Sequence, residues 1–285
     1  MTTQSIAQHP DALRKRLQSM WAAVAPAWGA NAEYLDTRGA AMTARMLELA
    51  DPKPGDRVLE LACGPGSVGL QVAELVGPGG EVVLSDVVPE MTAIAEGRTA
   101  HLPNVRTRVL DLEEIDEPDT AYDVVLCRDG LMLVPDPARA AHEIRRVLRP
   151  GGRAAAAVWG PRERNPWLGL VFDAVSEQLG TSMPPPGLPH PFALEDRDRF
   201  MAVLSGSGLT DVSVVEVEVP YSAGSSDEWW ERSSSLAGPI AQKLASLPEP
   251  AAQGLRERAR VAAAPYETPE GLVLPGVALV AFGRR

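Results

Sequence analysis

Short apolar runs alternate with segments of helical periodicity between residues 54 and 160. The apolar runs predict five strands, at residues 58–61, 81–84, 105–110, 122–127 and 153–159. Helical segments are expected after the first of these strands, through Gln71, Val72, Leu75 and Val76, and at residues 135–148 before the last. Strands that alternate with helices predict an α/β domain in which helices cover a mainly parallel sheet.

The flanking segments are mostly helical. Helices are expected at residues 11–24 and 32–50, with Pro26 and Gly29 ending the first and leaving Trp28 and Tyr34 in a linker. Beyond residue 160, helices are expected at 167–179, 194–205 and 222–264, an outer strand at 212–219 and a last strand at 277–282. The last two strands would close one edge of the sheet in antiparallel fashion. We therefore divide the chain into N-terminal cap helices (1–53), a core (54–160), an insert with a helix (161–210), and C-terminal strands with a helical insert that complete the same domain (211–285).

A strand, a tight turn and a helix succeed one another within residues 58–70, and residues 60–66 read ELACGPG. Gly64 and Gly66 permit positive φ and place no Cβ between the backbone and a ligand. The following helix directs its free N–H groups towards whatever lies above the turn. Glu60 stands inside an apolar strand, where an unpaired carboxylate is costly. This segment resembles motif I of the class I S-adenosylmethionine (SAM)-dependent methyltransferases. Gly64, Gly66 and Gly69 also satisfy the dinucleotide pattern G-x-G-x-x-G, so an NAD-dependent oxidoreductase is the alternative.

Two further segments favour the methyltransferase interpretation. Asp86 ends the second strand, about 20 residues past the glycines, where nucleotide-binding α/β folds hold a ribose diol. The continuation DVVPEM at residues 86–91 is similar to the methyltransferase pattern, and EIRRVLRPGG at residues 143–152 resembles a signature of the same superfamily. The resemblance covers roughly residues 54–159, which makes this segment the SAM-binding core, and is to the branch typified by ubiquinone and menaquinone biosynthesis.

The resemblance implies a Rossmann-like, doubly wound seven-stranded sheet of order 3-2-1-4-5-7-6, with strand 7 antiparallel and helical insertions acting as a cap or lid. It implies SAM as cofactor, S-adenosylhomocysteine as product, and no metal. In the family the acid at Glu60 faces the methionine end, Asp86 holds the ribose, and Asp111 with the Leu112 amide contacts adenine. The cofactor-binding residues that it assigns are Glu60, Ala62, Cys63, Gly64, Gly66, Asp86, Val87, Met91, Asp111, Leu112 and Cys127.

The acceptor site is less well marked. Arg128 and Asp129 follow the fourth strand, at the sheet edge where open α/β folds bind substrates, and His190 lies in a proline-rich insert. We take these three as catalytic candidates, since a base is needed only when the acceptor must lose a proton. Acceptor-binding candidates are Trp28, Arg128, Trp167 and Phe192. The expected activity is methyl transfer to oxygen, carbon or nitrogen of a small molecule such as a quinone precursor or natural product, and a non-catalytic SAM-binding protein is a second alternative.

Charge and local sequence restrict the classes of molecule that this protein is expected to bind. The chain of 285 residues carries a net charge of −11, which disfavours a non-specific grip on nucleic acid. Residues 127–130 read CRDG, so the N/D-P-P-Y-like string of base-modifying methyltransferases is missing after the fourth strand. Residues 1–11 lack an apolar signal core, and no apolar run approaches a bilayer-spanning length. We expect a cytoplasmic protein, a monomer or homodimer, whose partner is the acceptor rather than nucleic acid or membrane.

Overall fold

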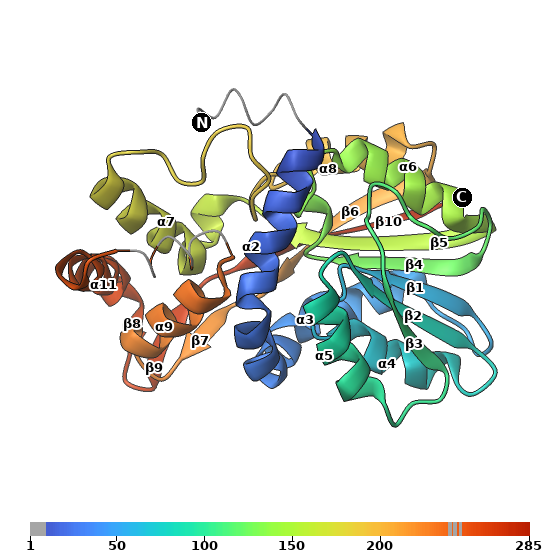
Figure 1. Ribbon diagram of the computed structural model, residues 1–285, viewed down its shortest axis with the longest axis horizontal. Coiled ribbons are helices and arrows are strands. Elements are labelled where there is room, and N and C mark those ends of the chain that lie inside the picture. The colour runs from blue at the N-terminus through green and yellow to red at the C-terminus, as the bar shows by residue number, and fades with distance from the viewer. Residues whose placement is uncertain (1–9, 239–240, 242–243, 245–246) are drawn as a thin grey trace.

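The computed structural model describes residues 10–238, 241, 244 and 247–285. Its centre is a seven-stranded sheet of order β3-β2-β1-β4-β5-β10-β6 (Figure 1). The strands span Arg57–Leu61 (β1), Glu81–Asp86 (β2), Val105–Val109 (β3), Tyr122–Arg128 (β4), Leu148–Trp159 (β5), Thr210–Glu218 (β6) and Val277–Arg284 (β10). The first five are parallel, and β10 runs antiparallel to both β5 and β6. The predicted strand order and its antiparallel strand are confirmed.

Helices cover both faces of this sheet. They span Ala32–Ala50 (α3), Ser67–Val76 (α4), Pro89–Thr99 (α5), Pro137–Val147 (α6) and Arg197–Gly206 (α8). Helix α3 packs against α4, and α6 against α8, on opposite sides of the strands (Figure 1). The central strand β1 is therefore buried over four consecutive residues, 58–61. Such continuous burial explains why its sequence is an apolar run rather than an alternating one.

The C-terminal region contains a second sheet that the sequence pattern did not predict. The expected long helix at 222–264 is instead β7 (Tyr221–Ala223), α9 (Ser226–Leu236) and α11 (Glu249–Ala263). Strand β7 joins β9 (Gly271–Leu274) and β8 (Glu267–Thr268) in the order β7-β9-β8. Strands of two to four residues are too short to display a period of two, so the pattern could not reveal them. Residues 239–240, 242–243 and 245–246 of that predicted helix lie outside the described residues.

The N-terminal helix is longer than predicted. Helix α2 spans Pro10–Ala30 and continues through Pro26 and Gly29, so Trp28 lies on a helix and not in a linker. An interior proline loses a backbone hydrogen bond and costs about 3 kcal/mol. Here the exposed Pro26 ring faces solvent while Val24 and Ala25 are buried, because α2 packs against α5 and α9. Burial of that face offsets the cost of the proline.

Helix α7 (Pro166–Leu179) packs against α9 and α11 and forms with them a helical group beside the sheet (Figure 1). Helix α2 runs between this group and the carboxyl ends of the parallel strands.

The predicted segment boundaries fall between α3 and β1, just after β5, and at the start of β6. Within the described part of the chain, no helix is long and apolar enough to cross a bilayer.

Candidate active site

The turn after β1 holds three residues in the left-handed region. These are Ala62 (φ 51°), Gly64 (φ 50°) and Gly66 (φ 85°). Ala62 is the unexpected member, because a side chain at positive φ is strained. Its methyl group is accommodated by Gly130, where an added Cβ would lie 2.5 Å from the Ala62 Cβ. The turn after β4 therefore packs directly against the turn after β1. The two sequence motifs, taken separately, do not predict this contact.

Asp86 stands at the end of β2, beside this turn. Its Oδ2 accepts a hydrogen bond from the Gly64 amide (3.0 Å) and its Oδ1 accepts one from the Val88 amide (2.9 Å). The residue is 9% exposed. Burial raises the pKa of the Asp86 carboxyl to about 6, although the two amides favour the ionised form. The carboxylate is thus held rigidly, and each oxygen keeps acceptor capacity for a further donor.

A narrow cavity of about 120 Å³ lies above Asp86 and gathers most of the predicted cofactor residues. Those that line it are Ala62, Gly64, Asp86, Val87, Met91, Asp111 and Leu112. The Oδ1 of Asp111 accepts a hydrogen bond from the Glu113 amide (2.8 Å), which fixes the loop after β3. Residues from the ends of three neighbouring strands therefore meet at one edge of the sheet, as the topology predicts.

Glu60 lies behind the wall of this cavity. It is 2% exposed, and its Oε2 has no hydrogen-bond partner. Burial raises the pKa of the Glu60 carboxyl to about 8, against the opposing influence of Arg128 and the backbone amides of Gly69 and Val68. The carboxyl therefore lies beneath the first turn of α4, and its predicted role towards the methionine end of a cofactor stays a prediction.

Three further predicted residues also lie behind the wall. Cys63 and Cys127 are buried free thiols, and burial raises the pKa of Cys127 to about 12. Gly66 packs on α5, where an added Cβ would lie 3.1 Å from the Ala95 Cβ. These residues shape the turn from below and do not face the cavity.

Helix α2 closes the narrow cavity from above. Trp28 lies over the turn, since a Cβ built on Gly64 would lie 3.6 Å from the Trp28 Cε3 atom. The Trp28 indole nitrogen donates a hydrogen bond to the Leu236 carbonyl (3.0 Å). Trp21 packs edge-on against the Trp28 ring, with the two ring centroids 5.8 Å apart. Ligand sites usually measure about 300–1,000 Å³. A ligand as large as SAM therefore requires Trp28 or α2 to shift, or must extend beyond this cavity.

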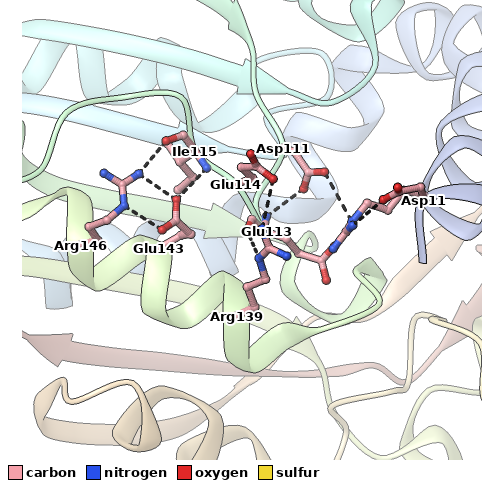
Figure 2. A network of polar contacts seen from close by, with 9 residues as sticks. Asp11, Asp111, Glu113, Glu114, Ile115, Arg139, Glu143 and Arg146 are labelled. Atoms are coloured by element: carbon pink, nitrogen blue, oxygen red, sulfur yellow. Dashed lines mark hydrogen bonds and ion pairs between the residues drawn. The ribbon is translucent and has the colours of Figure 1, made fainter. Parts of the chain in front are cut away.

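A network of polar contacts fastens α2 to the loop after β3 (Figure 2). The Nε of Arg14 donates to Glu113 Oε2 at 2.6 Å and lies 3.8 Å from Asp111 Oδ2. Glu113 is 1% exposed, and its Oε1 accepts from the Asp136 amide (2.5 Å). Arg139 in turn donates to the Glu113 carbonyl at 2.6 Å. The predicted adenine loop and the helix above it therefore form one polar unit.

A second, mainly apolar cavity of about 650 Å³ adjoins the first. Trp28, Trp167 and His190 line it. Nδ1 of His190 accepts a hydrogen bond from the Phe192 amide (3.1 Å). Phe192 itself does not line the cavity, because its ring lies behind Phe172 in an edge-to-face pair at 5.9 Å. Phe172 lines the cavity in its place, so Phe192 could reach an acceptor only after a rearrangement, and its predicted contact stays a prediction.

Arg128 and Asp129 line both cavities and so stand at their junction. The Arg128 Nη1 donates to Thr43 Oγ1 (2.8 Å) and passes over Gly39, where an added Cβ would lie 2.3 Å from Nη1. Asp129 has φ 59°, and its Oδ1 is buried without a hydrogen-bond partner. Burial raises the pKa of Asp129 to about 6, against the charges of Arg128 and Arg38. A carboxylate of this kind can accept a proton near neutral pH.

Sequence reasoning missed Arg38, Trp159 and Tyr221, which also line the large cavity. The available signal was the position of Arg38, four residues before the buried Met42 on the inner face of α3.

Over the described residues, no three His, Cys, Asp or Glu side chains converge as a potential metal site.

Residues 58–152 match the family described as the methyltransferase domain. The ubiquinone/menaquinone biosynthesis C-methyltransferase of Ectopseudomonas mendocina is 36% identical over 133 residues, which cover 46% of this chain and 52% of that enzyme. The nocamycin O-methyltransferase of Saccharothrix syringae is 34% identical over 143 residues, covering 47% and 51%. The matched segment thus spans about half the length of these relatives. The YcgJ protein of Bacillus subtilis shares the fold, with a TM-score of 0.59 at 18% identity over 85% of this chain and 97% of that protein. The likeness stated from motif I is confirmed over residues 58–152, which match a methyltransferase domain.

Proposed function

We propose that the protein transfers a methyl group from SAM, bound at the narrow cavity, to a small molecule bound in the large one. The observation that carries this proposal is that the two cavities meet. They share the lining residues Leu17, Trp21, Trp28, Arg128, Asp129 and Leu133. A cofactor anchored at Asp86 would thereby have access to an acceptor beside Trp167. The names of the two relatives specify transfer to carbon and to oxygen, respectively, so the acceptor atom stays open.

The residues of the narrow cavity fit the adenosine part of SAM. Asp86 offers two oxygens, each already fixed by one amide, to the two hydroxyls of a ribose. Asp111 and Leu112 stand further along the same cavity, where an adenine would be bound. When bound, SAM supplies an electrophilic methyl group on a sulfonium and leaves as S-adenosylhomocysteine.

The chain's own contribution is positioning, exclusion of water and acceptance of a proton. The apolar walls of the large cavity exclude water from the acceptor, and alignment for an in-line displacement supplies much of the acceleration. Asp129 accepts the proton that a hydroxyl, an enol or an amine releases, because it lines both cavities and its Oδ1 has no hydrogen-bond partner. Arg128, beside it in the chain, is fixed by its hydrogen bond to Thr43. No step here calls for a metal.

Cofactor choice is tested by calorimetry with SAM, S-adenosylhomocysteine and NADH. We expect micromolar binding of the first two and none of NADH. Asp86→Asn removes the charge and one acceptor, so the affinity for SAM should fall at least tenfold, the scale of a charge-assisted hydrogen bond. Asp116→Asn is the matched control, because that side chain is 94% exposed and paired with Arg108 on the surface. Binding of NADH in preference to SAM would replace the methyltransferase proposal with the oxidoreductase alternative.

Turnover is tested with methyl-labelled SAM and a panel of phenols, enols and amines. Asp129→Asn should lower kcat about 100-fold without changing the affinity for SAM, since general-base catalysis contributes about 10²–10⁴-fold. The wild-type rate should rise as the pH passes through about 6, the pKa of Asp129. Tight SAM binding without turnover of any acceptor would favour the non-catalytic SAM-binding alternative.

A further inference from the structure

Arg38 lies within a cluster of aromatic rings in the wall of the large cavity. Its Cζ is 3.9 Å from the centroid of the Trp167 ring, 4.5 Å from that of Tyr221 and 5.0 Å from that of Trp159. Trp167 and Tyr221 are themselves stacked, with centroids 6.0 Å apart and planes at 14°. Side chains from α3, β5, α7 and β7 thus converge on one guanidinium group. Such convergence fixes the position of the charge in the wall.

No acidic side chain among the described residues forms an ion pair with Arg38, although many of the other arginines have one. Its hydrogen bond is to the Tyr34 hydroxyl at 3.4 Å, and its Nη2 is buried without a partner. Burial lowers the pKa of Arg38, but a guanidinium keeps its charge in proteins. Burial raises the pKa of Tyr34, so the phenol stays neutral and does not balance that charge. The charge of Asp129 also acts on Arg38, but Asp129 forms no ion pair with it and interacts with Arg128 as well, so it does not fully balance the guanidinium. A buried cation without a paired counter-charge is costly unless something else supplies one.

The charged groups that line the large cavity are also unbalanced. Three arginines, Arg16, Arg38 and Arg128, face one carboxylate, Asp129. Burial lowers the pKa of His190, which therefore stays neutral near pH 7 and does not add to the positive charge. The lining of the large cavity is therefore positively charged, although the whole chain carries a net charge of −11. A positive lining in a water-poor site favours an anionic ligand over its neutral analogue.

We propose that the methyl acceptor is an aromatic molecule that carries an anionic oxygen, and that Arg38 binds this oxygen. The inference rests on the proposed function and specifies the substrate class of the same site. The aromatic and apolar lining accepts the ring, through contacts with side chains such as Trp28 and Phe172. The guanidinium supplies the counter-charge as a fork of donors, which suits a carboxylate or phenolate oxygen. Arg38 is thus a specificity-determining residue that pairs with the acceptor.

The test compares 2-naphthoate with 2-naphthylmethanol, a neutral molecule of similar shape. Binding to the wild-type protein is measured by quenching of tryptophan fluorescence at about pH 7.5, where the carboxyl group is ionised. We expect the wild type to bind naphthoate at least tenfold more tightly than the alcohol, and Arg38→Met to lose this preference. Arg38→Lys should keep part of it, because the charge is retained. Arg45→Met is the matched control, since Arg45 lies on the same helix, pairs with Glu48 at 2.6 Å and lines neither cavity.

Two outcomes would overturn the inference: a wild-type protein without a preference for naphthoate, or an Arg38→Met variant that keeps the full preference. The wild-type comparison alone is decisive if the methionine variant does not fold. Binding of S-adenosylhomocysteine is measured on the same proteins. A failure of the proposed function would appear as absent cofactor binding, whereas a failure of this inference would appear as equal binding of the two probes beside normal cofactor binding.

Discussion

Glu60→Gln should change how stability depends on pH in the absence of cofactor. Glutamate in an unfolded chain titrates near 4.5, whereas burial raises the pKa of Glu60 to about 8 in the folded protein. The folded state therefore binds this proton more tightly than the unfolded state does. The stability that protonation supplies is complete below pH 4.5 and is lost as the pH rises towards 8. Glutamine has the shape of the protonated acid but does not titrate, so the variant lacks this loss.

The loss amounts to about 1.4 kcal/mol per pH unit, or roughly 4 kcal/mol between pH 4.5 and 7.5. Urea unfolding of the wild type and the variant at several pH values within this range measures it directly. Asp86 and Asp129 also have raised pKa values and contribute a trend of the same sign, which is common to both proteins. The informative quantity is therefore the difference between the two curves. Curves that stay parallel over the whole range would refute the account of Glu60 as a buried carboxyl group with a raised pKa.

Three further predictions concern the turn and its surroundings. Gly64→Val should abolish SAM binding in calorimetry, because φ is 50° there and a side chain would grow towards Trp28; normal affinity would show that the turn has been misinterpreted. Gly39→Ala should leave the Tm unchanged or raise it, since alanine is the better helix former by about 1 kcal/mol, yet lower kcat by displacing Arg128; unchanged turnover would show that Arg128 is free to move. Cys63 and Cys127 are buried by the protein itself, so alkylation should be slow with or without SAM and fast only in denaturant; rapid labelling of the native protein would contradict their placement.

The central sheet and much of the candidate cofactor site could be predicted because each depends on local sequence. Alternating apolar runs and helical segments specify the strands, and parallel strands bring their carboxyl ends to one edge. An acid at the end of a strand, such as Asp86 or Asp111, is therefore placed beside the glycine turn without knowledge of the side-chain packing. Both residues do line the narrow cavity.

The large cavity could not be predicted in the same way because tertiary packing determines it. Pro26 ordinarily ends a helix, yet burial of the residues before it carries α2 onwards and places Trp28 over the turn. Arg38 has the sequence context of an ordinary helical arginine, and only the folded chain surrounds it with three aromatic rings. The sequence pattern places Phe172 within a predicted helix and does not mark it as a lining residue, whereas in the folded chain Phe172 lines the cavity and Phe192 packs behind it.

A crystal structure of the complex with S-adenosylhomocysteine tests the central claim most directly. The account predicts that the ribose hydroxyls lie within hydrogen-bond distance of Asp86 and that the adenine lies beside Asp111 and Leu112. It also predicts that the sulfur faces the large cavity near Asp129, with Trp28 displaced from its position over Gly64. A ribose that makes no contact with Asp86, or a sulfur that faces away from the large cavity, would contradict the assignment of the two cavities to cofactor and acceptor.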